Sequence, residues 1–213
     1  MLSGSPGLAQ RASPMTAPTP LLIRLGIWAW LIAALVVGHF QWLQRSMAPV
    51  VPVLTLTLAS LVLLAYFRLP PVRAWFDGLD LRALVLLHVT RFVGLYVLVL
   101  YARGMLPYAL AVPAGWGNTL AAALALVVCF TPLAPAGRLR AISIWNMIGF
   151  ADILLVVLSG LRLGLADPGR MRALGTLPLS LLPTFLAPLM LAIHVIIFLR
   201  VRQALAPGLR HAS

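Results

Sequence analysis

The sequence predicts an all-α membrane protein: a bundle of six transmembrane helices with both ends of the chain in the cytoplasm. Of its 213 residues, 62% are hydrophobic and 9% are charged, and the mean hydropathy is +1.02. A soluble domain has about a quarter of its residues charged. Several apolar runs of about 20 residues match the roughly 30 Å hydrocarbon core of a bilayer at 1.5 Å per helical residue. Lipid is therefore the medium in which this chain is expected to fold.

Six apolar runs are predicted to span the membrane. They are residues 21–43, 49–67, 79–102, 118–135, 139–160 and 178–199. A short connection at Ala136 and Gly137 makes the fourth and fifth runs an antiparallel hairpin. The chain thus divides into a disordered tail over 1–19, a six-helix domain over 20–203 and a short basic tail over 204–213.

Residues 103–117 (RGMLPYALAVPAGWG) are unusually apolar for a loop. The run 105–112 is too short to span, and Pro107 and Pro113 interrupt regular helix. We favour a half-helix lying in the membrane interface, with Tyr108 and Trp116 at headgroup depth. A re-entrant loop that lines a cavity is the alternative.

Arginine counts predict the orientation, because cytoplasmic loops carry the excess of basic residues. The side that carries the chain ends has ten arginines: Arg11, Arg24, Arg68, Arg73, Arg82, Arg138, Arg140, Arg200, Arg202 and Arg210. The other side has five: Arg45, Arg103, Arg162, Arg170 and Arg172. Both ends are therefore predicted to be cytoplasmic, in a bacterial inner membrane.

The composition also excludes several kinds of chemistry. All 16 basic residues are Arg and all four acidic residues are Asp. Without Lys there is no Schiff base or P-loop lysine, and without Glu there is no HExxH zinc motif. The single Cys129 cannot build a multi-cysteine metal site, and no metal site is expected. The net charge of +12 is dispersed between apolar runs, so we expect contact with anionic lipids and no nucleic-acid binding.

Polar residues inside the predicted spans are the candidate site, because a central Arg or Asp costs roughly 2.5–3.5 kcal/mol on insertion scales. Counting from the cytoplasmic helix ends puts His88, Asn146 and His194 at depths of about 9–12 Å. Arg91 and Asp152 lie deeper, at about 16–18 Å, near the midplane. We expect two layers: three residues that line a common cavity, and a central ion pair that is either structural or functional.

Two segments carry a resemblance to a known class of protein. AGWGN (114–118) and WNMIGFAD (145–152) resemble segments of small uncharacterised multi-pass bacterial inner-membrane proteins, in which an Asp is expected where this chain has Asn118. The resemblance implies no activity. His39, Asn118 and Trp116 are secondary candidates, with Asn118 expected near the outer face.

The leading functional prediction is a non-enzymatic membrane protein that binds a small or lipidic ligand or serves as a subunit of a membrane assembly, including a homo-oligomer. One alternative is a redox protein that holds haem b or a quinone between the third and sixth spans, with His88 and His194 as haem ligands. Another is a proton-coupled transporter that uses Arg91, Asp152 and His88.

Overall fold

The computed structural model describes residues 19–45 and 50–209, which are helical and contain no strand. Within these ranges, six helical segments are long and apolar enough to cross a membrane, as predicted. Four of them are single helices: α1 (Leu21–His39), α2 (Val50–Arg68), α6 (Tyr108–Phe130) and α7 (Pro135–Ala166). The third span consists of α4 (Leu81–Leu87), η2 (His88–Phe92) and α5 (Val93–Ala102) in succession. The last span consists of η4 (Leu182–Leu186) followed by α8 (Ala187–Leu209). Residues 1–18 of the predicted tail, and 210–213, lie outside the described residues.

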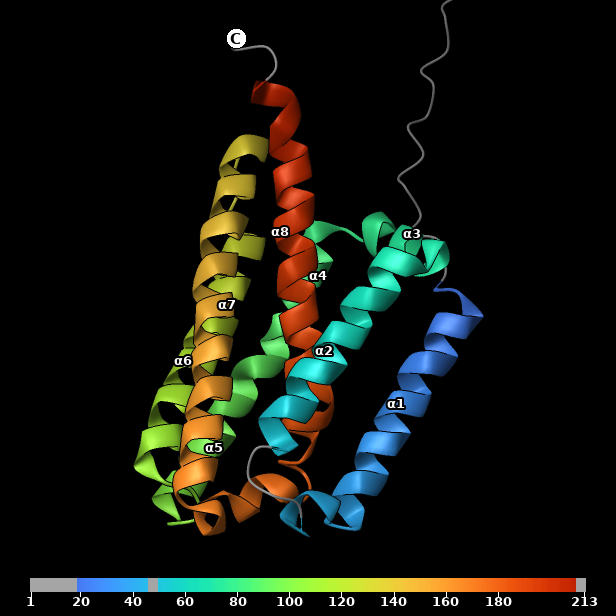
Figure 1. Cartoon of the computed structure of the whole chain (residues 1–213). Helices are drawn as coiled ribbons and strands as arrows, with labels where there is room; N and C mark the ends of the chain where they lie inside the picture. Colours follow the sequence, from blue (N-terminus) through green and yellow to red (C-terminus); the bar gives the residue numbers. More distant parts are fainter. Residues whose placement is uncertain (1–18, 46–49, 210–213) are drawn as a thin grey trace, which may run out of the picture.

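The six spans form one bundle whose first helix begins at the end where its last helix finishes (Figure 1). We call this the terminal end. The short helices η1 (Trp42–Arg45) and η3 (Pro168–Gly175) lie at the opposite end, which we call the distal end. Six passes therefore bring both described ends of the chain to one side of the membrane.

Several predicted boundaries were wrong, and two of them change the interpretation of a connection. The segment 103–117 is neither an interfacial half-helix nor a re-entrant loop, because α6 already begins at Tyr108 and runs through Pro113. A proline is tolerated in a membrane helix when local adjustment satisfies the freed carbonyl. The connection between α6 and α7 lies at residues 131–134, so Ala136 and Gly137 belong to the first turn of α7. Pro135 starts α7, where its missing N–H costs nothing.

A short amphipathic helix, α3 (Pro70–Gly78), lies at the terminal end between the second and third spans. The sequence analysis placed these residues in a loop. The Arg200 side chain of α8 donates from Nη1 to the carbonyl oxygens of Phe76 and Leu79, at 3.1 and 2.6 Å. Since the last carbonyls of a helix have no partner within it, this arginine caps α3 and ties it to the last span.

Prolines explain how the last span begins and how the first two spans are attached to it. Pro188 has no N–H, so the carbonyls of Pro183 and Thr184 lose the donor that a π- or α-helix would offer. Thr55 of α2 donates to the Pro183 oxygen at 3.0 Å, and Trp30 of α1 donates from Nε1 to the Thr184 oxygen at 2.8 Å. Orphaned backbone acceptors of the last span thus anchor both helices.

Trp30→Phe should weaken the attachment of α1, because it leaves the Thr184 oxygen without its donor. We expect a loss of about 1 kcal/mol in the free energy of unfolding and faster amide exchange in α1. Trp28→Phe is the matched control, since the Trp28 side chain is exposed. Equal exchange rates in the two variants would show that the Trp30 hydrogen bond does not hold α1.

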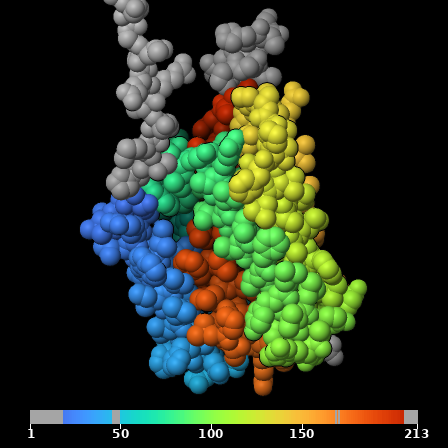
Figure 2. Space-filling model, turned by 180° about the vertical axis from the view of Figure 1, so that it is seen from behind, coloured from blue at the N-terminus to red at the C-terminus, as the bar shows by residue number. Residues whose placement is uncertain are grey.

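The remaining five spans pack tightly around the middle of the bundle. A Cβ atom on Gly94 of α5 would collide with the Gly115 carbonyl oxygen of α6, so only glycine permits this approach. Buried side chains from all five of these spans, among them Tyr66, Trp145 and Ile193, form the main core. Viewed from behind, the last span stays visible between α1 and the green third and fourth spans (Figure 2). The first span is therefore peripheral, and the polar site lies among the other helices.

Candidate functional site

The third span tightens into a 3-10 turn at the middle of the bundle, and this turn carries both His88 and Arg91. In a 3-10 helix, residues three apart lie directly above one another, so His88 and Arg91 share one face. The Thr90 hydroxyl donates to the Leu87 carbonyl at 2.8 Å within the same turn. His88 is 0% exposed and Arg91 is 3% exposed, so both point into the bundle.

The Arg91 guanidinium joins four spans. Its Nε donates to Asn118 Oδ1 of α6 at 2.8 Å, and its Nη2 forms an ion pair with Asp152 of α7. Its Nη1 donates to the Gly149 carbonyl of α7 at 3.0 Å and lies 3.3 Å from His194 Nε2 of α8. Because a buried cation is tolerated only when it is paired and hydrogen-bonded, these contacts allow Arg91 to lie within the membrane.

The contacts of His194 determine its tautomer. Arginine can only donate, so Nε2 of His194 must be the bare, accepting nitrogen. Nδ1 therefore carries the proton and donates to Asn146 Oδ1 at 2.7 Å, while Asn146 Nδ2 donates back to the His194 carbonyl at 3.0 Å. Asn146 thus holds His194 by both its ring and its backbone, and a neutral imidazole completes the Arg91 site.

Two glycines make room for this network. A Cβ atom on Gly117 of α6 would collide with the Asp152 carboxylate. A Cβ atom on Gly149 of α7 would lie 2.8 Å from His194 Cε1 and 3.2 Å from Arg91 Nη1. These glycines belong to the segments 114–118 and 145–152, which therefore meet at Arg91. The sequence analysis named both segments but gave neither glycine a role.

In the structure, the polar residues of the two predicted layers form one connected group. The predicted contact of Arg91 with Asp152 is confirmed. The two predicted layers are in contact, because His194 touches both Arg91 and Asn146. The prediction that two of His88, Asn146 and His194 line a common cavity was wrong, since all three are 0% exposed and the cavity beside Arg91 is lined by other residues.

The two histidines do not form a haem site or a site for a flat ligand between them. The ring centroids of His88 and His194 are 4.2 Å apart, so the rings touch and leave no space for an iron or a quinone ring between them. Both nitrogens of His194 already face Asn146 and Arg91. Neither ring nitrogen of His88 has a hydrogen-bond partner among the described residues, and its ring packs edge-on against Trp145. Within the same residues, no group of three or more His, Cys or Asp side chains could hold a metal ion.

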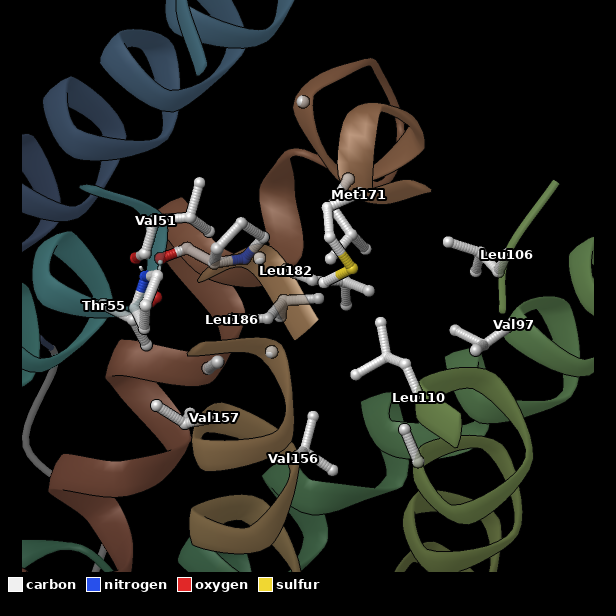
Figure 3. A pocket seen from close by; sticks show the side chains of 18 of the residues that line it. Val51, Thr55, Val97, Leu106, Leu110, Val156, Val157, Met171, Leu182 and Leu186 are labelled. Carbon is white, nitrogen blue, oxygen red and sulfur yellow. Dashed lines mark hydrogen bonds between the residues drawn. The ribbon is translucent and has the colours of Figure 1, made fainter. Parts of the chain in front are cut away.

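A cavity of about 250 Å³ lies beside Arg91 and extends toward the distal end. Arg91 and Asn118 line it at the middle of the bundle, and Gln44 of η1 and Arg172 of η3 line it at the distal end. Between them the wall is mainly aliphatic, and side chains from α2, α5, α6, α7 and the last span point toward its interior (Figure 3). The sequence does not predict this cavity, because most of its lining residues are ordinary apolar residues that belong to five separate spans.

The three secondary candidates lie in different surroundings. Asn118 is within α6 beside Arg91, and so not near an outer face as predicted. Its Nδ2 donates to the Ala114 carbonyl at 2.7 Å. Trp116 is 62% exposed on the outer surface of α6, and His39 is exposed at the end of α1, where its ring packs against Phe40. Only Asn118 belongs to the site.

The comparisons with known proteins identify a family and no activity. No curated protein and no solved structure matches the chain. Residues 48–202, which run from the start of the second span into the last, match a family described as a domain of unknown function. This match leaves out α1, the peripheral helix, and includes every residue of the Arg91 network. Since it spans more than half of the sequence, the chain belongs to the family DUF8737.

Proposed function

We propose that this multi-pass protein binds a small, largely apolar ligand in the cavity beside Arg91. The observation that carries the proposal is the cavity itself: about 250 Å³, walled mainly by aliphatic side chains, with the polar groups of Arg91 and Asn118 at one end. Ligand sites are mostly apolar cavities with a few placed polar groups.

A side chain that fills the cavity tests the proposal. Gly160 lines the cavity, and a Cβ atom added there would meet only Met171 Cε, at 4.0 Å. In Gly160→Leu the new side chain should occupy part of the cavity and lower the affinity for apolar probes such as decane by about tenfold or more. Binding is measured in lipid nanodiscs from the rise in unfolding temperature with probe concentration, because a ligand stabilises the folded state by mass action.

Gly26→Leu is the matched control for this test. Gly26 lies on α1, and a Cβ atom added there would meet nothing within 4 Å, so the same side chain is added where it contacts no other helix. We expect this variant to bind the probes as the unaltered protein does. If Gly160→Leu also binds them unchanged, the cavity is not the binding site and the proposal fails.

We also propose that the terminal end faces the cytoplasm of a bacterium, in its inner membrane. The proposal is supported by the excess of arginines in the loops of that end and by the resemblance of residues 114–118 and 145–152 to bacterial inner-membrane proteins. Reporter fusions after Ser213 and near Asp167 should report opposite sides, with Ser213 cytoplasmic. A periplasmic reporter at Ser213 would contradict the orientation. Proton-coupled transport and a role as a subunit of an assembly stay predictions.

A further inference from the structure

We infer that the ligand of this cavity is a single-chain amphipath whose uncharged oxygen, a carbonyl or a hydroxyl, contacts Arg91 and Asn118. The inference rests on the proposed function and specifies the chemistry of the same site. Three properties of the site support it: the size of the cavity, the charge balance at its polar end, and the hydrogen-bond donors that remain there.

Size limits the ligand to one chain. A volume of about 250 Å³ lies just below the roughly 300–1,000 Å³ of most small-molecule sites. This volume is small compared with that of a lipid that carries two acyl chains. The cavity extends from Arg91 to the residues of η1 and η3 at the distal end, so it accommodates an elongated molecule along the bundle.

The charge balance at the polar end favours an uncharged head. Arg91 is already paired with Asp152, and the bare Nε2 of His194 shows that this imidazole is neutral. The charges at this end therefore sum to zero. An anionic or cationic head would introduce an unpaired charge at the middle of the membrane, where charge is costly.

The remaining donors favour a head that accepts hydrogen bonds. A guanidinium has five N–H groups, and four of those of Arg91 face acceptors within the described part of the chain. An asparagine amide has two N–H groups, and one of those of Asn118 is used by the Ala114 carbonyl. One donor of each residue thus remains, and both residues line the cavity. A ligand oxygen beside them would accept hydrogen bonds from these two donors, whereas a purely apolar ligand would not.

Three ten-carbon probes test the inference with the full chain in nanodiscs: methyl octyl ketone, decane and decanoate at about pH 9, where the acid is ionised. We expect the ketone to bind about tenfold more tightly than decane, since a hydrogen bond from a charged donor contributes about that factor. Decanoate should bind more weakly than the ketone. Equal affinities for ketone and decane would overturn the inference, as would tighter binding of decanoate.

Two variants locate the head of the ligand. Asn118→Asp keeps an acceptor for Arg91 Nε but removes the amide donor and adds a negative charge, so it should abolish the preference for the ketone over decane. Arg172→Gln, at the distal end of the cavity, should leave that preference unchanged. If Arg172→Gln abolishes the preference and Asn118→Asp does not, the head lies at the distal end and the inference is wrong.

The failure of this inference is distinguishable from failure of the proposed function. If Gly160→Leu weakens the binding of ketone and decane equally, and neither probe is preferred by the unaltered protein, the cavity binds apolar ligands but does not select the head. If Gly160→Leu weakens neither, the cavity is not the binding site and both proposals fail.

Discussion

Replacing Arg91 by leucine should lower the free energy of unfolding by about 3–5 kcal/mol, because it leaves the partly buried carboxylate of Asp152 without its cation inside the bundle. Asp152 loses its ion pair, and the accepting atoms of Asn118 and His194 lose their donor. Adding Asp152→Asn should recover about half of the loss or more, since it removes the unpaired charge at nearly constant volume. Unfolding in mixed micelles at increasing denaturing-detergent concentration measures both variants.

An exposed ion pair of the same chain is the control for Arg91. Arg73 and Asp77 of α3 lie 3.5 Å apart, with side chains 53% and 37% exposed. Arg73→Leu should cost less than about 1 kcal/mol, because water and salt screen such a pair. If Arg91→Leu costs no more than Arg73→Leu, or if Asp152→Asn adds to its cost, Arg91 does not hold the spans together as its contacts indicate.

Gly117→Ala should destabilise the protein by about 1–3 kcal/mol, the usual cost of overpacking. The added methyl group would collide with the Asp152 carboxylate and displace it from Arg91. In a helix interior, alanine is otherwise favoured over glycine by about 1 kcal/mol. A lower free energy of unfolding therefore indicates the collision, whereas a higher one indicates that helix propensity dominates. The same unfolding experiment measures it.

Gly26→Ala is the control, because it makes the same substitution at a glycine where the added methyl group has no atom to collide with. Gly26 lies in the interior of α1, and a Cβ atom there has nothing within 4 Å. This variant should be as stable as the unaltered protein or slightly more stable. A stabilised Gly117→Ala would mean that α6 and α7 can separate at no cost, and that the contact of Asp152 with Arg91 does not depend on the close approach of these helices.

The number of spans could be predicted from the sequence because the bilayer sets the length of an apolar helix. The pairing of Arg91 with Asp152 could also be predicted, since two opposite charges at one depth in hydrocarbon are each costly alone. Neither prediction required knowledge of how the helices pack.

The place of His194 could not be predicted, because its depth was counted from a helix end that was wrong. The count began at residue 199, whereas α8 continues to Leu209. Ten further residues add about 15 Å at 1.5 Å per residue. The predicted start of the fifth span, residue 139, had a smaller error, since α7 begins at Pro135. The contact of His194 with Arg91 depends on how α8 packs against the third span, and counting residues along one helix does not give that packing.

The sequence by itself determined the medium, the six spans and the central ion pair, because each follows from the cost of exposing polar groups to lipid. The tertiary structure alone decided the rest of the site. Asn118 and His194 reach Arg91 only because Gly117 and Gly149 allow the helices to approach closely. The cavity likewise exists only where five spans fail to fill the space between them. Both depend on distances between segments far apart in the chain, and the pattern of hydropathy along the sequence carries no record of those distances.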